Sequence, residues 1–213
     1  TPGHDVELAA GFLVSEGVIH RGDQFARAIH CGGPGTGGPL AGNTENTYNV
    51  LDVSLAPGVA PPDPDLARNF YTTSSCGLCG KASIESVHGH FAPLAKREPL
   101  VAAETLLQLP AKLRAEQETF DKTGGLHAAG LFDADGNLLT LREDVGRHNA
   151  VDKVLGRSMF DENFPLDDRV LMVSGRASFK ILQKALAGRL PVVCAVSAPS
   201  SLAVEFAQDS GQT

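Results

Sequence analysis

The chain has 213 residues, of which 42% are hydrophobic and 20% charged, and this composition excludes a protein that is disordered throughout. Its formal net charge of -7 argues against a broad electrostatic surface for DNA or RNA, and no apolar run approaches the roughly 18 residues that a membrane span needs. Because its four cysteines do not have the spacing of a secreted disulfide framework, we expect a soluble, cytoplasmic protein with no nucleic-acid or membrane partner.

The first 65 residues contain one predicted helix and one predicted strand. Apolar side chains at helical spacing predict a helix in "DVELAAGFLVSEGVI", and "TYNVLDVSL" has the composition of a strand. The proline-rich "APGVAPPDPD" is typical of a linker and places a domain boundary near residue 65. We therefore expect a smaller N-terminal α+β portion over residues 1–65 and a second domain over 66–213, with both ends of the chain incomplete.

Two helical patterns precede the clearest part of the second domain. "KASIESVHG" predicts a helix directly after a Gly- and Ser-rich loop. "VAAETLLQLPAKLRAEQETF" predicts a helical stretch that Pro110 interrupts, because proline has no amide hydrogen to donate within a helix.

From Gly124 onward the predicted elements alternate regularly. "LHAAGLFDADGNLLTLRED" predicts a β-hairpin that turns at Asp135-Gly136, and "VGRHNAVDKVL" predicts the helix that follows. "RVLMVSG" and "PVVCAVSA" are apolar runs typical of strands covered on both faces, and each precedes a helix. The order β-β-α-β-α-β-α predicts a layered α/β domain whose ligands bind beyond the carboxyl ends of the strands.

The loop "SSCGLCG" holds the candidate reactive residues, Cys76 and Cys79, with Lys81 close behind them. A Cys-X-X-Cys arrangement, a nearby cation and a following helix all lower the pKa of a thiol, and the thiolate is the reactive form. The pattern therefore favours an accessible sulfur nucleophile.

Two other interpretations of this thiol pair remain open. A structural zinc ion needs four ligands, and the remaining two would come from a small set: Cys31, Cys194, His88 or His90. A thioredoxin-like redox pair is expected near a βαβ pattern, whereas this pair precedes the α/β region. A zinc deaminase site is excluded, because that site needs an H-x-E motif and the chain has none.

Three loops at predicted strand ends carry side chains suited to an anion. The N-terminus of a helix offers free backbone N–H groups, arginine can bind a phosphate with two hydrogen bonds, and histidine can also move protons. The candidate binding residues are Arg147, His148, Ser174, Gly175, Arg176, Ser197 and Ser200. Helix capping alone would also explain the serines, and a solvated helix face would explain Asp152 and Lys153.

Four stretches, "TPGHDVELAAGFLVSEGVI", "TSSCGLCGKASIE", "REDVGRHNAVDKVLG" and "SGRASFKILQKA", resemble the FdhD family of formate dehydrogenase accessory sulfurtransferases. The resemblance implies a cytoplasmic, homodimeric sulfur carrier with no permanently bound cofactor. Such a carrier receives persulfide sulfur from a cysteine desulfurase. It transfers that sulfur to the molybdenum (or tungsten) bis-guanine-dinucleotide cofactor, a transient ligand, before the cofactor enters formate dehydrogenase.

The resemblance also implies residue roles and a fold. Cys76 carries the persulfide and Cys79 assists, while the main domain has a three-layer, cytidine-deaminase-like α/β fold without the zinc signature. Family members extend further at both ends, so only part of the cofactor site is expected in this chain. The alternative function is that of a cofactor-binding chaperone that transfers no sulfur and whose fold is stabilised by a bound zinc ion.

Overall fold

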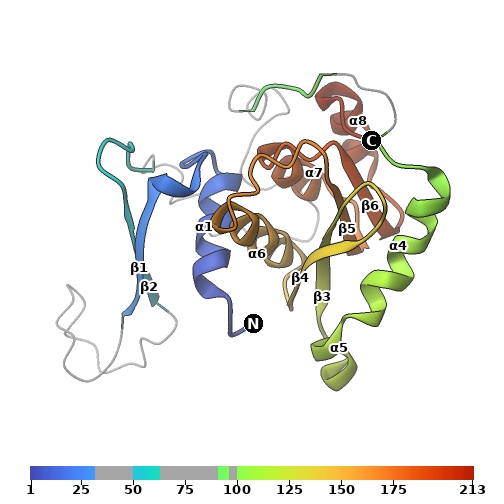
Figure 1. Cartoon of the computed structure of the whole chain (residues 1–213), viewed down its shortest axis with the longest axis horizontal. Coiled ribbons are helices and arrows are strands. Elements are labelled where there is room, and N and C mark those ends of the chain that lie inside the picture. The colour runs from blue at the N-terminus through green and yellow to red at the C-terminus, as the bar shows by residue number, and fades with distance from the viewer. Residues whose placement is uncertain (32–49, 63–90, 96–99) are drawn as a thin grey trace.

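The computed structural model describes residues 1–31, 50–62, 91–95 and 100–213 of the chain (Figure 1). Two β-sheets are present in this part. The strands are β1 (Phe25–Cys31), β2 (Val50–Leu55), β3 (His127–Phe132), β4 (Leu138–Asp144), β5 (Val170–Arg176) and β6 (Val192–Ser197). The described helices are α1 (Asp5–Ser15), α4 (Ala103–Ala115), α5 (Glu118–Thr123), α6 (Arg147–Phe160), α7 (Phe179–Ala187) and α8 (Ser201–Ser210), with a short 3-10 turn, η1 (Gly22–Gln24), before β1.

The larger sheet has the strand order β4-β3-β5-β6. β3 pairs antiparallel with both β4 and β5, and β5 pairs parallel with β6. The predicted order β-β-α-β-α-β-α from residue 124 is therefore confirmed. The hairpin turns where the sequence predicts: Gly136 has a φ of 77°, and the Asp133 carboxylate accepts the backbone N–H groups of Asp135 (3.0 Å) and Asn137 (2.8 Å).

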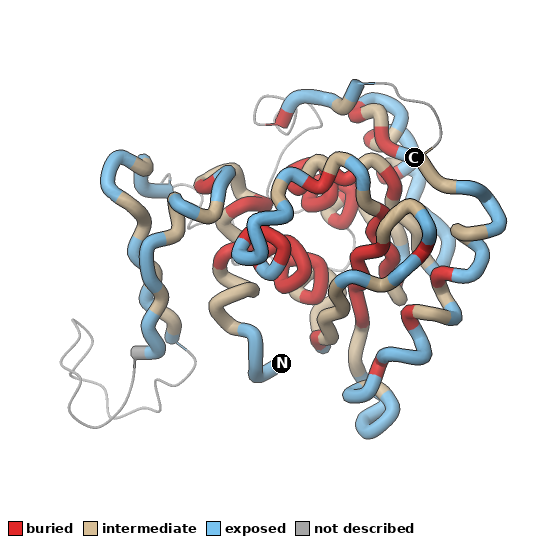
Figure 2. Tube along the Cα trace, viewed as in Figure 1, coloured by how far each residue is buried: buried red, intermediate tan, exposed pale blue. Residues whose placement is uncertain are grey.

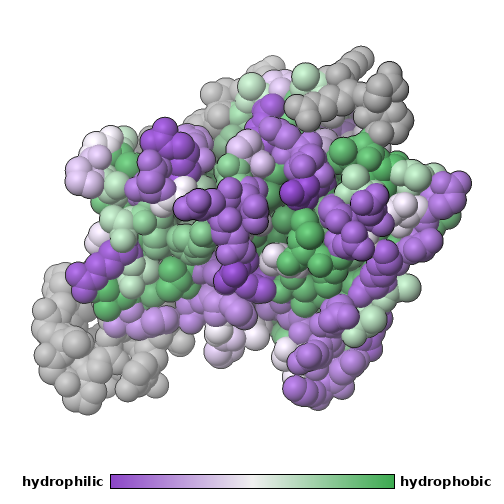
Figure 3. Space-filling view, viewed as in Figure 1, coloured by the Kyte–Doolittle hydropathy of each residue, from purple (hydrophilic) through white to green (hydrophobic). Residues whose placement is uncertain are grey.

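Helices cover both faces of this sheet. On one face, Leu131, Leu171 and Val173 pack in the same buried cluster as Val151 and Val154 of α6, with residues of α7. On the other face a second cluster joins the sheet to α4. Figure 2 shows buried positions concentrated in α6 and the central strands. Figure 3 shows hydrophilic side chains over much of the outward surface of α4 and α5, as expected for an outer layer.

The predicted interruption at Pro110 is wrong, because α4 continues through this residue to Ala115. Leu109 and Leu113, on either side of the proline, are fully buried against the sheet. Burying two leucines stabilises the folded state by about 3–6 kcal/mol. This gain offsets the roughly 3 kcal/mol by which an internal proline destabilises a helix. α4 ends at Ala115, with Glu116 as its C-cap, before α5 begins at Glu118.

The N-terminal helix α1 crosses α6 at very short range through two glycines. A Cβ atom on Gly11 would lie 1.8 Å from the backbone oxygen of Asp152, and one on Gly156 would lie 1.9 Å from the backbone oxygen of Glu7. Real side chains cannot approach backbone this closely. The two backbones therefore contact each other directly, and only glycine fits at either position.

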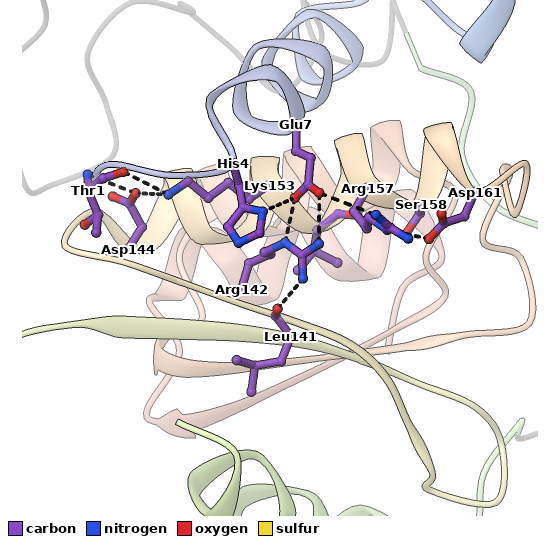
Figure 4. Close-up of polar contacts among 11 residues, drawn as sticks. Thr1, His4, Glu7, Leu141, Arg142, Asp144, Lys153, Arg157, Ser158 and Asp161 are labelled. Carbon is purple, nitrogen blue, oxygen red and sulfur yellow. Dashed lines mark hydrogen bonds and ion pairs between the residues drawn. The ribbon is translucent and has the colours of Figure 1, made fainter. Parts of the chain in front are cut away.

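Ion pairs surround this crossing, as Figure 4 shows. The Glu7 carboxylate of α1 accepts two hydrogen bonds from the Arg142 guanidinium, at 2.6 and 2.9 Å, and faces His4 at 3.4 Å. Burial by itself raises the pKa of Glu7, but the hydrogen bonds and charge of Arg142, with the charges of His4 and Arg157, hold this pKa below its ordinary value. The ionised carboxylate thereby ties α1 to β4.

Asp152 and Lys153 do not lie on a solvated helix face, in contrast to the simplest interpretation of the sequence. Both oxygens of Asp152 accept from the Lys184 ammonium at 2.8 Å, and Ser15 donates to one of them at 2.7 Å. Lys153 is 1% exposed and pairs with Asp144 at 2.6 Å. The sheet packs against one side of α6, and α1 packs against another side. Polar side chains of α6 are therefore buried, and they form ion pairs with neighbouring elements.

The smaller sheet is a two-stranded arm with no fully buried residue among those described (Figure 2). The predicted strand is confirmed for Val50–Leu55, with alternate residues half-buried, but its partner β1 was not predicted.

The domain boundary near residue 65, the predicted helix "KASIESVHG" and the glycine-rich stretch after Cys31 lie outside the described residues. In the part of the chain that is described, no helix combines the length and apolar character needed to cross a bilayer.

Candidate functional site

The predicted sulfur site lies outside the part of the chain that the structure describes. Cys76 and Cys79, together with the possible zinc ligands His88 and His90, fall within residues 63–90. Their roles stay predictions. The residues that can be placed are those of the predicted anion site, at the carboxyl ends of β4, β5 and β6.

The turn between β4 and α6 is organised by the buried carboxylate of Asp144. It accepts the backbone N–H of Gly146 at 2.9 Å and the side-chain amide of Asn149 at 3.2 Å, and it pairs with Lys153. Burial raises the pKa of Asp144, but the bonds from Lys153 and Gly146 outweigh this effect and lower the pKa overall. This arrangement fixes the first turn of α6, which begins at Arg147.

The structure brings Arg147 and His148 of α6 together with the end of β5 and the start of α7. Nε2 of His148 lies 3.5 Å from the hydroxyl of Ser178, the residue that precedes α7. A Cβ atom on Gly175 would lie 3.5 Å from Cδ of Arg147. The Nε atom of Arg147 is buried and has no hydrogen-bond partner within the described structure. These four residues therefore line one site, with an arginine N–H free to bind a ligand.

The predicted serines have partners of their own. Ser174 accepts the backbone N–H of Ala128 at 2.8 Å, and Ser200 caps α8 by accepting from Ala203 at 3.2 Å. Helix capping is thus confirmed for Ser200. Each hydroxyl keeps its own proton to donate, so these bonds do not prevent contact with a ligand.

Arg176 and Ser197 lie beside each other at the ends of β5 and β6, and both are exposed. No hydrogen bond or ion pair joins Arg176 to Arg147 or His148 in the described residues. Ser197 also borders a largely apolar hollow of about 320 Å³ between β6 and α8. The predicted binding residues therefore form two neighbouring groups, one at the start of α6 and one at the end of β6.

Positive charge gathers around His148. Burial is the largest cause that lowers the pKa of His148, and together with the charges of Arg147, Lys184 and Lys180 it brings this pKa to about 4. We call Arg147, Lys180 and Lys184, which surround the neutral His148, the cationic cluster. Lys184 is paired with Asp152, so the charges of Arg147 and Lys180 are those that favour an anionic ligand here.

His148 is expected to make the protein less stable in mild acid. Its pKa is about 6.5 in the unfolded chain but about 4 in the folded one, so between these pH values the unfolded state binds a proton that the native state does not. The free energy of unfolding should therefore fall as the pH drops through this window. His148→Gln should reduce that loss, as measured by urea unfolding at several pH values.

The exposed His20 supplies the matched control for this measurement. His20→Gln should leave the pH dependence of the unfolding free energy as it is in the parent protein. An equal effect of the two substitutions would contradict the assignment of the acid sensitivity to His148.

His127 was not predicted from the sequence to belong to the site. Its ring nitrogen Nδ1 would lie 3.5 Å from a Cβ atom on Gly175. Strand pairing brings it there, because β3 is antiparallel to β5, and the first residue of such a strand lies at the same edge as the end of its partner. The hairpin prediction did not include which strand would pair with β3.

No group of three or more His, Cys, Asp or Glu side chains that could hold a metal ion occurs within the described ranges. Cys194, one of the possible zinc ligands, lies in β6 and is partly buried against the cluster that includes α4. Burial raises the pKa of the Cys194 thiol, which disfavours its reactive form.

Comparisons with known proteins agree on one family. The family model described as FdhD/NarQ matches residues 1–213. Proteins named sulfur carrier protein FdhD from Streptomyces coelicolor and Mycolicibacterium paratuberculosis are each 54% identical to the whole chain, which covers 74% and 76% of their lengths. A solved structure described as a formate dehydrogenase accessory protein, from Desulfotalea psychrophila, aligns with the whole chain and 72% of its own length at a TM-score of 0.66. Its sequence identity of 24% makes this a likeness of fold.

Proposed function

The chain belongs to the FdhD/NarQ family, and from this membership we propose that it is a sulfur carrier that supports the maturation of formate dehydrogenase. The observation that carries the proposal is the 54% identity, over the whole chain, to relatives named sulfur carrier proteins. The cationic cluster adds physical support, because a carrier that delivers sulfur to a phosphate-bearing cofactor needs a site for phosphate.

Sulfur uptake is proposed to occur at Cys76. Its thiolate attacks the outer sulfur of a persulfide on a cysteine desulfurase, forming a new S–S bond as the donor's S–S bond breaks. The desulfurase cysteine leaves as a thiolate, and Cys76 becomes the persulfide. The step needs no external oxidant or reductant, because the sulfur atom keeps its oxidation state.

Sulfur release is proposed to involve Cys79. Its thiolate attacks the inner sulfur, that of Cys76, so a Cys76–Cys79 disulfide forms and the outer sulfur leaves as hydrosulfide. The two cysteines lose two electrons and the transferred sulfur gains them. A thiol reductant then returns the disulfide to two thiols, completing the cycle of a sulfurtransferase.

The acceptor is proposed to be the molybdenum (or tungsten) bis-guanine-dinucleotide cofactor, bound as a transient substrate. Arg147 and His148 would contact its phosphates from α6, and Gly175 would lie beside them at the end of β5. Arg176, Ser174, Ser197 and Ser200 would add donors at the ends of the neighbouring strands. The buried, unpartnered Nε of Arg147 supports this part of the proposal.

Assembly, location and fold relationship follow from the family resemblance. We expect a homodimer in the cytoplasm, with a cysteine desulfurase and formate dehydrogenase as partners. We also expect the main domain to correspond to a cytidine-deaminase-like architecture without its zinc site. The strand order β4-β3-β5-β6 with helices on both faces is consistent with that expectation.

Intact-mass analysis tests the proposed function. The chain is incubated with a cysteine desulfurase and cysteine, and we expect the mass of one added sulfur atom, which a thiol reductant removes. Zinc content is measured on the same sample. Stoichiometric zinc with no added sulfur would favour the zinc-stapled chaperone and refute the carrier.

A further inference from the structure

We propose that the hollow between β6 and α8 is a subsite for the flat aromatic base of a nucleotide, whose phosphate groups are held at the mouth of the hollow by Arg176. This inference rests on the proposed function, since it gives a place to the guanine base of the same substrate. Neither the sequence motifs nor the family resemblance pointed to this hollow.

The hollow exists because short side chains leave the space between β6 and α8 unfilled. Its volume is about 320 Å³, at the lower end of the roughly 300–1,000 Å³ typical of small-molecule pockets. Protein interiors ordinarily contain few voids larger than a water molecule, so a hollow of this size has room for a ligand. Several of the lining residues are alanines, from β6, α8 and the turn before α7: Ala177, Ala195, Ala203 and Ala207.

The lining suits an uncharged ring. Among the described residues, no Asp, Glu, Lys or Arg side chain borders the hollow, and most of the lining side chains are aliphatic. Val193, Ala195 and Ser197 share one face of β6, because strand positions two apart point the same way. The exposed side chains of Ser197 and Gln208 also border the hollow, and both can donate or accept hydrogen bonds at the edge of a base. Apolar walls with a few polar groups are typical of small-molecule sites.

Positive charge lies beside this hollow. Arg176 is the register partner of Ser197 across β5 and β6, and it is exposed. The backbone N–H of Ser200 donates to the backbone oxygen of Ala177 at 3.1 Å, which ties the residue after Arg176 to the start of α8. The first turn of α8 adds the positive end of a helix dipole. A nucleotide joins an uncharged ring to anionic phosphates, so its two parts match the hollow and this positive mouth.

Three probes bound to the full chain test the two parts separately: GDP, guanosine, which lacks phosphate, and pyrophosphate, which lacks the base. Ala207→Leu fills the hollow from α8 and should raise the dissociation constants for GDP and guanosine by about tenfold or more, with pyrophosphate binding unchanged. Arg176→Ala should weaken the binding of GDP and pyrophosphate and leave guanosine binding unchanged. Ala111→Leu makes the same change at an exposed position of α4 and is the matched control.

Alanine methyl signals in NMR give a readout without mutation. The signals of Ala195 and Ala207 should shift when GDP or guanosine is added, but not when pyrophosphate is added. Because this measurement uses the parent protein, it decides the question even if Ala207→Leu does not fold.

The inference is overturned if Ala207→Leu binds GDP and guanosine as the parent does and the two methyl signals do not move. It is also overturned if guanosine leaves these signals unmoved and Ala207→Leu dissociates a dimer of the parent, since a second copy then fills the hollow. A parent chain that binds no GDP overturns the base subsite as well. Sulfur loading at Cys76 is measured separately, so only its failure would refute the carrier function itself.

Discussion

Cys76→Ala is expected to abolish sulfur loading, reducing the added mass after incubation with a desulfurase to background. The physical reason is that the persulfide bond needs a thiolate at the position of attack, and alanine has no nucleophile. Formate dehydrogenase produced in cells that carry only this variant should be inactive. Cys79→Ser should still load sulfur but release it slowly, because the serine hydroxyl does not attack a disulfide sulfur at neutral pH.

The matched control is Cys194→Ser, which removes a thiol that is partly buried in β6 and whose pKa burial raises. Loading should be the same as in the parent protein. Sulfur that remains bound to Cys76→Ala, or that disappears with Cys194→Ser, would mean that the carrier residue has been misassigned.

Gly156→Ala is expected to destabilise the protein by about 3 kcal/mol or more, which lowers the melting temperature by on the order of 10 °C. Alanine ordinarily stabilises a helix relative to glycine by about 1 kcal/mol, so the expected sign is the opposite of the intrinsic propensity. The cause is steric, because the new Cβ atom would lie 1.9 Å from the backbone oxygen of Glu7 and force α1 away from α6. Gly11→Ala should act similarly, since its Cβ atom would lie 1.8 Å from the oxygen of Asp152.

Gly125→Ala is the control for an added methyl group. Its Cβ atom would have one neighbour within 4 Å, the oxygen of Thr123 at 3.9 Å, so the free energy of unfolding should change by less than about 0.5 kcal/mol. Thermal and urea unfolding measure both variants. A Gly156→Ala protein as stable as the parent would show that the two helices do not pack at the short distance described.

The family and most of the main domain could be predicted from the sequence because their signals are local. The Asp-Gly turn, the strands β5 and β6 and the spacing of α6 are each encoded within a short window, and the structure confirms these elements. The predicted cover on both faces holds for β5 but not for β6, which lies at the edge of the described sheet and is only partly buried. The long motifs around the thiols and around Arg147 predicted the family that the comparisons confirm. The anion site was predicted at the strand ends, and the structure places Arg147, His148 and Gly175 together there.

What the tertiary structure decided depends on residues far apart in the chain. Pro110 remains within α4 because the sheet buries Leu109 and Leu113, and Asp152 and Lys153 are buried because α1 covers α6. His127 joins the site only through the pairing of β3 with β5. Burial against a distant element can outweigh a local preference of a few kcal/mol, and no short window of sequence specifies which element that will be.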